Sequence, residues 1–219
     1  DRLYVFEAAG SILGAEEVPE DKQCERLMQV CQVLCGRIVE FVNITDAENG
    51  ALASQNAMRC VVALSNLSKG FSARICVQLR PKVGEIFRSA MEVTISCLKR
   101  WPREKGVRHR VVGYLHQMVQ ILNETIVPYL PDAVDSLRSN GTNSKELGET
   151  LVLINQLSNT FKEALLPMIA PLFLPLRLQV HENIRAGFSQ SASSDEFTRE
   201  SHELERNWIQ TVNTFALTS

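Results

Sequence analysis

The sequence of 219 residues lacks the features typical of membrane proteins, disulfide-rich proteins and zinc proteins. It has no run of about 18 apolar residues, so we expect no membrane span. Its six cysteines include no Cys-X-X-Cys pair and no zinc-like spacing with histidine. Because a free cysteine packs as a small apolar residue, we expect buried thiols in a reducing compartment, with a disulfide or a metal site as the alternative.

Signatures of catalysis are also missing from the sequence. We find no nucleophile elbow, no glycine-rich phosphate loop and no carboxylate pair in a catalytic context. The acidic pairs Glu16-Glu17 and Glu20-Asp21 stand at expected helix starts, where the helix dipole favours negative charge. We therefore expect a protein that is not an enzyme and that needs no cofactor and no metal.

Aromatic residues are scarce, at 6%, while 45% of the chain is apolar. The apolar residues are mostly Leu, Val, Ile and Ala, a mixture that suits helix-on-helix packing better than a β-sandwich. The formal net charge is −2, from 23 basic and 25 acidic residues. The whole chain is therefore no obvious binder of polyanions, and any nucleic-acid interface has to be local.

Apolar residues recur with the helical period along almost the entire chain. Thr45 or Asp46 is expected to cap the third helix and Ser144 the seventh. Pro128 and Pro131 are expected to break the helix that precedes them. The expected helices cover residues 2–14, 20–43, 46–70, 81–100, 106–127, 132–137, 144–161, 167–184 and 195–217.

These helices follow one another in pairs of about 45 to 50 residues, within the range of HEAT-type units. Each helix has one broad apolar face, which stacking of successive pairs would bury. The pattern predicts an all-α fold, a HEAT-repeat-like α-α superhelix (solenoid) of consecutive antiparallel helix pairs, with a compact helical bundle as the alternative. We expect a single continuous segment over 1–219, with approximate units 1–44, 45–101, 102–143, 144–188 and 195–219.

Two apolar features could be read as core or as contact surfaces. The stretch Leu165–Leu178 is the most hydrophobic, and we expect it to be buried between neighbouring helices, with a partner groove as the alternative. Trp101 could stack on a base, but its position before Pro102 at a helix end favours a role in covering the core. Trp208 lies on an apolar stripe and is expected to pack.

The strongest local feature is the basic segment Lys99–Arg110, in which six of twelve residues are basic and one is acidic. Since it joins two expected helices, it would project several long cationic side chains from one edge of a helix stack. Arginine and lysine there can neutralise phosphates, and an A-form RNA duplex is read through phosphates and shape. The candidate RNA-contacting residues are Arg100, Arg103, Lys105, Arg108 and Arg110.

A solvated charged turn is the alternative interpretation of this segment. His109 would add to its charge when protonated. A second, weaker cluster surrounds the preceding helix connection and comprises Lys69, Arg74, Arg80 and Lys82. For this second cluster we favour a plain surface loop over a nucleic-acid role.

Several short stretches along nearly the whole chain carry a family resemblance. They are Leu3–Gly10, Gly106–Arg108, Leu115–Met118, Val127–Pro131, Leu153–Leu157, Phe161-Lys162 and Ile209–Val212. In these stretches and their order, the chain resembles the exportin-T family of the importin-β superfamily. None of them is a chemical motif by itself, so their number and order carry the resemblance.

The resemblance implies a middle-to-C-terminal section of a large superhelix that exports tRNA from the nucleus. The partners it implies are tRNA and Ran in its GTP form, the latter bound mainly by repeats outside this sequence, and it adds nucleoporins as candidates. It further implies shuttling between nucleus and cytoplasm. The sequence starts at Asp1 without a methionine, and we read it as a piece of a longer protein. A HEAT scaffold or related receptor that binds protein cargo through its helix faces is the alternative function.

Overall fold

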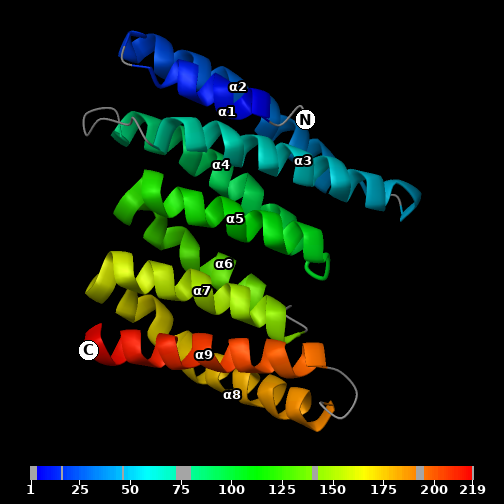
Figure 1. Cartoon of the computed structure of the whole chain (residues 1–219). Coiled ribbons are helices and arrows are strands. Elements are labelled where there is room, and N and C mark those ends of the chain that lie inside the picture. Colours follow the sequence, from blue (N-terminus) through cyan, green and yellow to red (C-terminus); the bar gives the residue numbers. More distant parts are fainter. Residues whose placement is uncertain are drawn as a thin grey trace. The chain divides into compact units, whose positions relative to one another are not determined.

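The structure of the chain is a computed structural model (Figure 1). It describes residues 4–15, 17–45, 47–72, 80–139, 143–190 and 195–218. Within these ranges the regular structure is helical and contains no strand. The predicted all-α class is therefore confirmed.

The chain divides into two compact units, residues 1–129 and 130–219. The first contains α1 (Tyr4–Leu13), α2 (Glu20–Val42), α3 (Ala47–Ser72), α4 (Arg80–Arg100), α5 (Lys105–Leu122) and the 3-10 helix η1 (Asn123–Tyr129). The second contains α6 (Leu130–Ser139), α7 (Ser144–Phe161), the 3-10 helix η2 (Lys162–Leu165), α8 (Leu166–Gln190) and α9 (Asp195–Thr218). The single continuous segment with five repeat units stays a prediction.

Helices of the first unit form two layers, as in a HEAT-type stack. In one layer α3 packs between α1 and α5, and in the other α2 packs beside α4 (Figure 1). Contacts at both ends of α2 and α4 show that these two helices run parallel. Lys82 meets Asp21 where both helices begin, and Arg100 reaches the carbonyl oxygen of Val42 where both end.

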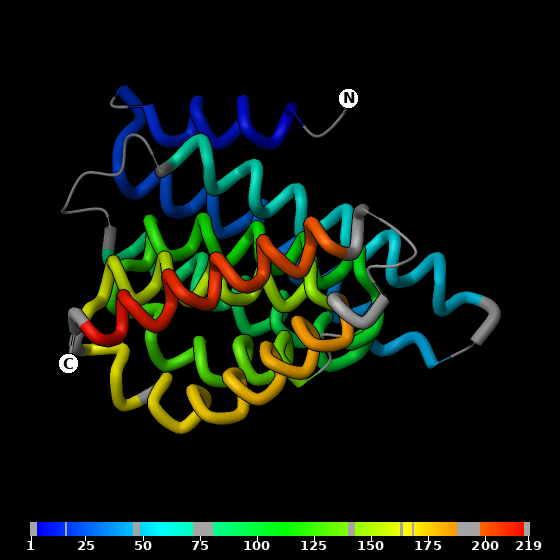
Figure 2. The backbone as a smooth tube through the Cα atoms, turned by 60° about the horizontal axis from the view of Figure 1, so that its bottom comes forward, coloured from blue at the N-terminus to red at the C-terminus, as the bar shows by residue number. Residues whose placement is uncertain are grey.

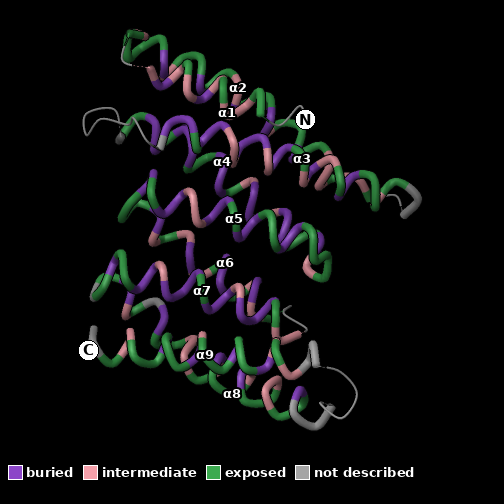
Figure 3. Tube along the Cα trace, viewed as in Figure 1, coloured by how far each residue is buried: buried purple, intermediate pink, exposed green. Residues whose placement is uncertain are grey.

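The layers are joined by the apolar stripes that the sequence pattern predicts. Figure 3 shows buried and exposed residues alternating along each helix. Leu27, Ile38, Leu64, Phe87 and Leu115 are completely buried. Such stripes cannot be shielded by one helix alone, so the contact of each helix with its neighbours supplies the main stabilising term of the unit.

Two helix ends differ from the sequence-based expectation. The helix predicted over 106–127 ends at Leu122, because Asn123 has a positive φ of 50° and cannot continue it. Asparagine tolerates this backbone region better than most residues. The start of α7 is capped by Asn143, and not by Ser144, through a 2.9 Å hydrogen bond from the Glu146 amide to the Asn143 Oδ1.

The second unit pairs α7 with α9 and α8 with α9 (Figure 2). Asn155 of α7 donates from Nδ2 to the Asn207 carbonyl oxygen of α9 at 3.3 Å. As predicted, Trp208 packs: it is 8% exposed and its ring lies 5.2 Å from that of Phe173. The expected burial of Leu165–Leu178 is wrong in part, because Leu174 and Leu178 are 60% and 57% exposed on the outer face of α8.

Helices α1 and α3 approach so closely that two glycines meet at their crossing. A Cβ added at Gly70 would lie 2.4 Å from the carbonyl carbon of Gly10, and one added at Gly10 would lie 2.2 Å from the carbonyl oxygen of Leu67. Backbone atoms cannot swing aside as a flexible side chain can. The close contact between α1 and α3 therefore requires glycine at both positions.

We predict that Gly70→Ala destabilises the first unit by about 2 kcal/mol, since overpacking of this size costs 1–3 kcal/mol. Gly36→Ala is the matched control, because a Cβ at Gly36 in α2 has no neighbour within 4 Å. That control should stabilise the protein by about 0.5–1 kcal/mol through helix propensity. Urea denaturation followed by circular dichroism measures both, and an equal response of the two variants would contradict the close crossing.

Candidate nucleic-acid interface

The basic segment Lys99–Arg110 is held in a defined shape by the end of α4, a short turn and the start of α5. The Trp101 amide donates to the Cys97 carbonyl oxygen at 2.9 Å, and the Glu104 amide donates to that of Trp101 at 3.2 Å. Trp101 is 8% exposed and covers the core, so base stacking by its ring is not supported. Ser54 of α3 donates to the Glu104 carboxylate at 3.3 Å, which ties the turn to α3.

Arg100 anchors this turn to the preceding helix connection. Its Nε donates to the Val42 carbonyl oxygen at 3.1 Å and its Nη2 to that of Ile44 at 2.9 Å. These are carbonyl groups at the C-terminal end of α2, where a positive charge is favoured by the helix dipole. Arg100 therefore has a structural role beside any contact with RNA.

Arg108 points inward and not toward solvent. Its side chain is 2% exposed although the sequence pattern made it a candidate for phosphate contact. Position 108 follows Val107 on the face of α5 that packs into the unit, where Val107 and Val111 are also buried. We therefore leave Arg108 out of the set of residues that can reach an RNA backbone.

Arg103, Lys105 and Arg110 are exposed, and His109 is exposed beside them. Arg103 lies in the turn, while the other two project from the first two turns of α5. We define Arg103, Lys105 and Arg110 as the cationic edge. Glu104 is the one acidic residue within the segment, and its hydrogen bond to Ser54 engages its carboxylate with α3.

A further cation, Arg59 of α3, was missed by sequence reasoning. It follows Met58, whose sulfur lies only 2.8 Å from the position of a Cβ built on Gly106. Arg59 itself is exposed, and its Nη1 donates to the Asn56 Oδ1 of the same helix at 3.2 Å. Only the packing of α3 against α5 brings residues so distant in sequence together.

The second predicted cluster lies at the opposite end of α4 from the cationic edge. The 21 residues of α4 span about 30 Å, with Lys82 at its start and Arg100 at its end. Lys69 is exposed near the end of α3, and Lys82 lies 3.7 Å from the Asp21 carboxylate. Arg74 and the side chain of Arg80 lie outside the described residues. The two clusters therefore cannot form one continuous patch.

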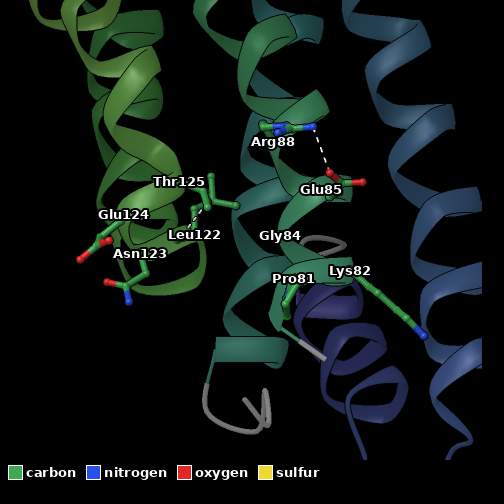
Figure 4. Close-up of a pocket in the computed structure, with 9 residues that line it drawn as sticks. All are labelled: Pro81, Lys82, Gly84, Glu85, Arg88, Leu122, Asn123, Glu124 and Thr125. Atoms are coloured by element: carbon green, nitrogen blue, oxygen red, sulfur yellow. Dashed lines mark hydrogen bonds and ion pairs between the residues drawn. The ribbon is translucent and has the colours of Figure 1, made fainter. Parts of the chain in front are cut away.

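A pocket of ≈ 580 Å³ opens near Lys82, between the start of α4 and the end of α5 (Figure 4). Its lining includes Lys82, Glu85, Arg88, Leu122 and Glu124. Arg88 pairs with Glu85 at 3.2 Å, while Lys82 extends toward Asp21. Since its cations face carboxylates and Glu124 adds another negative charge, this pocket is poorly suited to phosphate.

The described cysteines are free thiols; Cys31, Cys60 and Cys97 are buried as expected, whereas Cys24 and Cys35 are half-buried. Desolvation by burial raises the pKa of Cys31 and of Cys97 to about 12. Cys76 lies outside the described residues. In the part of the chain that is described, no three His, Cys, Asp or Glu side chains are grouped as a metal site. None of the described helices has the length and apolarity needed to cross a membrane.

Comparison with known proteins gives a consistent family. The family model described as Exportin-T matches residues 1–216. The chain belongs to the Exportin-T family. It is 32% identical to the Exportin-T of Oryza sativa subsp. japonica over 216 residues, which are 95% of this chain and 22% of that protein. It is 31% identical to that of Arabidopsis thaliana, over 94% of this chain and 21% of the relative.

More distant relatives agree with this assignment. The human Exportin-T is 25% identical over 83% of this chain and 19% of its own length. The chain thus spans about a fifth of the length of the curated relatives it matches. The resemblance inferred from scattered stretches of the sequence is confirmed.

We predict that Arg100→Ala lowers the free energy of unfolding by about 1 kcal/mol, because two carbonyl groups at the end of α2 lose a charged donor. Arg103→Ala removes the same charge from the neighbouring turn, where Arg103 is exposed, and should change stability by less than about 0.5 kcal/mol. Urea unfolding of both variants at low and high salt measures their free energies of unfolding. Equal stabilities would show that Arg100 does not anchor the turn.

We also predict that stability falls as pH rises above 9. The folded pKa of Cys31 and Cys97 lies near 12, above the ordinary value of 9.0, so folding favours the protonated thiols. This contribution is complete below pH 9 and is lost as pH rises toward 12. Urea midpoints measured under reductant at pH 8 and pH 10.5 should drop more for the native chain than for a Cys31→Ala/Cys97→Ala variant. If the urea midpoints of the two proteins fell equally between the two pH values, the raised pKa of Cys31 and Cys97 would be contradicted.

Proposed function

We propose that this chain forms part of a nuclear export receptor that binds tRNA together with Ran-GTP and carries the tRNA from the nucleus to the cytoplasm. Family membership supports the receptor class. The observation that carries the RNA contact is the cationic edge: Arg103 is exposed in a turn held by Trp101 and Arg100, and Lys105 and Arg110 are exposed on the first two turns of α5. Ran-GTP would contact mainly repeats outside this sequence, and nucleoporins are further candidate partners of the whole receptor.

The proposed recognition is of backbone and shape. The arms of a tRNA are A-form duplexes whose deep major groove side chains cannot read, whereas their phosphates are accessible. Lys105 and Arg110 lie five residues apart on α5, a rise of about 7.5 Å and a rotation of about 140° around the helix axis, so that they would reach separate phosphates and not two neighbours of one strand. Such contacts need no base-specific residue, in keeping with a receptor for many tRNAs.

Protein cargo is the second candidate, and exposed apolar residues favour it. Tyr4, Val5 and Ile12 on α1 are more than 60% exposed, and Met28, Val33 and Val39 on α2 more than 40%. Exposed apolar groups of this size on neighbouring helices are typical of protein contact surfaces. If this function holds, polar substitutions on α1 and α2 should abolish cargo binding, and changes in the cationic edge should not.

For RNA binding we predict that charge reversal at Arg103, Lys105 and Arg110 in the full-length receptor weakens tRNA affinity about 10- to 100-fold at physiological salt. A plot of the logarithm of the tRNA association constant against the logarithm of the salt concentration should have a slope shallower by about 2, since two or three phosphate contacts are lost. Fluorescence titrations at several salt concentrations measure both quantities.

The matched control reverses three exposed arginines of the second unit, Arg177, Arg199 and Arg206, and so changes the net charge equally. It should leave affinity and slope nearly unchanged. Equal weakening by the two triple variants would indicate a general charge effect, and no weakening by the first would refute the cationic edge as an RNA contact.

A further inference from the structure

An exposed threonine lies beside the anchor of the cationic edge. Thr45 is exposed in the connection between α2 and α3, one residue after Ile44, whose carbonyl oxygen accepts a 2.9 Å hydrogen bond from Arg100. A guanidinium group has five N–H donors, of which these carbonyl contacts engage two. Arg100 therefore has donors left for an anionic group placed on the neighbouring residue.

The sequence after Thr45 is acidic, with Asp46 at the first and Glu48 at the third following position. Kinases with a basic substrate groove select acceptor hydroxyls that are followed by carboxylates, by ordinary charge complementarity. In the same chain, the exposed Thr125 is followed by Ile126, Val127 and Pro128 and has no such acidic residues. The two threonines thus differ in the acidic residues that follow them, which an acidophilic kinase recognises.

The described residues at the start of α3 lie outside the core. Gly50 and the exposed Asn49, Ala51 and Leu52 precede Ala53, the first buried residue of α3 among those described. A Cβ at Gly50 would meet nothing within 4 Å, so this glycine lowers helix stability without serving a close contact. Opening of the first turn would let the chain around the exposed Thr45 take the extended form that a kinase needs.

We propose that Thr45 is a phosphorylation site for an acidophilic serine/threonine kinase and that its phosphate, held by Arg100, weakens RNA binding at the cationic edge. This inference rests on the proposed tRNA-binding function. In the reaction, the Thr45 Oγ1 attacks the γ-phosphorus of ATP, the bond to the β-phosphate oxygen breaks, ADP leaves and the hydroxyl proton passes to a base of the kinase.

The phosphate on Thr45 would lower RNA affinity through its negative charge. Phosphothreonine carries about −1.5 to −2 charges at pH 7 and three acceptor oxygens, and it would sit at the N-terminal end of α3, where the helix dipole stabilises it. The same charge opposes the approach of RNA phosphates to the neighbouring cations. The phosphate on Thr45 would thus be held by Arg100, three residues before Arg103, and would repel RNA phosphates that approach the cationic edge.

To test this, the full-length receptor is incubated with ATP and a purified kinase that prefers acidic residues after the acceptor serine or threonine. Mass spectrometry locates the phosphate, and tRNA affinity is measured before and after treatment at about 0.15 M salt. We expect phosphorylation at Thr45 and a loss of affinity of about five- to tenfold. Thr45→Ala should abolish both, and Thr45→Glu should reproduce part of the loss without kinase. Gly50→Ala should slow the modification about fivefold by stabilising the first turn of α3.

Thr125→Glu is the matched control, because it adds the same charge beyond the far end of α5, about 27 Å away. It should leave tRNA affinity unchanged. Absence of phosphate on Thr45 would overturn this inference and leave the proposed function standing. The same holds if phosphorylation leaves tRNA affinity unaltered while charge reversal of Arg103, Lys105 and Arg110 lowers it. If that charge reversal itself has no effect, the proposed function fails, and this inference fails with it.

Discussion

Each amphipathic helix of this chain can bury its apolar stripe only against the helices before and after it. Leu27, Leu64 and Leu115 belong to three different helices of the first unit, and all three are completely inaccessible to solvent. Such packing fixes which face of each helix is inside and leaves the other face and the turns without a role in the core. The position of charged residues relative to these stripes then decides which of them can meet a partner.

The basic segment illustrates this division. Trp101 and Arg100 are engaged with the fold, one by covering the core and the other by hydrogen bonds to the end of α2. With the turn held in this way, Arg103, Lys105 and Arg110 are presented to solvent without the entropy cost of ordering a free loop. A fixed set of cations suits recognition of a rigid RNA duplex by shape, since the phosphates of an A-form arm are themselves at regular spacing.

Hydrophobic periodicity was sufficient to predict the all-α fold and most helix boundaries, because burial of the stripes dominates the energetics. It failed where a single residue decided the outcome, as at Asn123, whose positive φ ends α5 early. In the candidate interface, local charge density pointed to the turn between α4 and α5 but could not tell the buried Arg108 from the exposed Arg110. The exposed Arg59 could not be connected with this segment, because only the packing of α3 against α5 brings its neighbour Met58 to Gly106, about fifty residues away in sequence.

The central claim is that the turn between α4 and α5 contacts tRNA within the intact receptor. Hydrogen–deuterium exchange of the full-length protein, with and without saturating tRNA, tests it without any substitution. We expect the amides of residues 101–107 to exchange more slowly when tRNA is bound. The amides of the connections at the opposite end of α4 should show no such slowing. Unchanged exchange across this segment, together with tRNA-dependent protection elsewhere in the receptor, would contradict it.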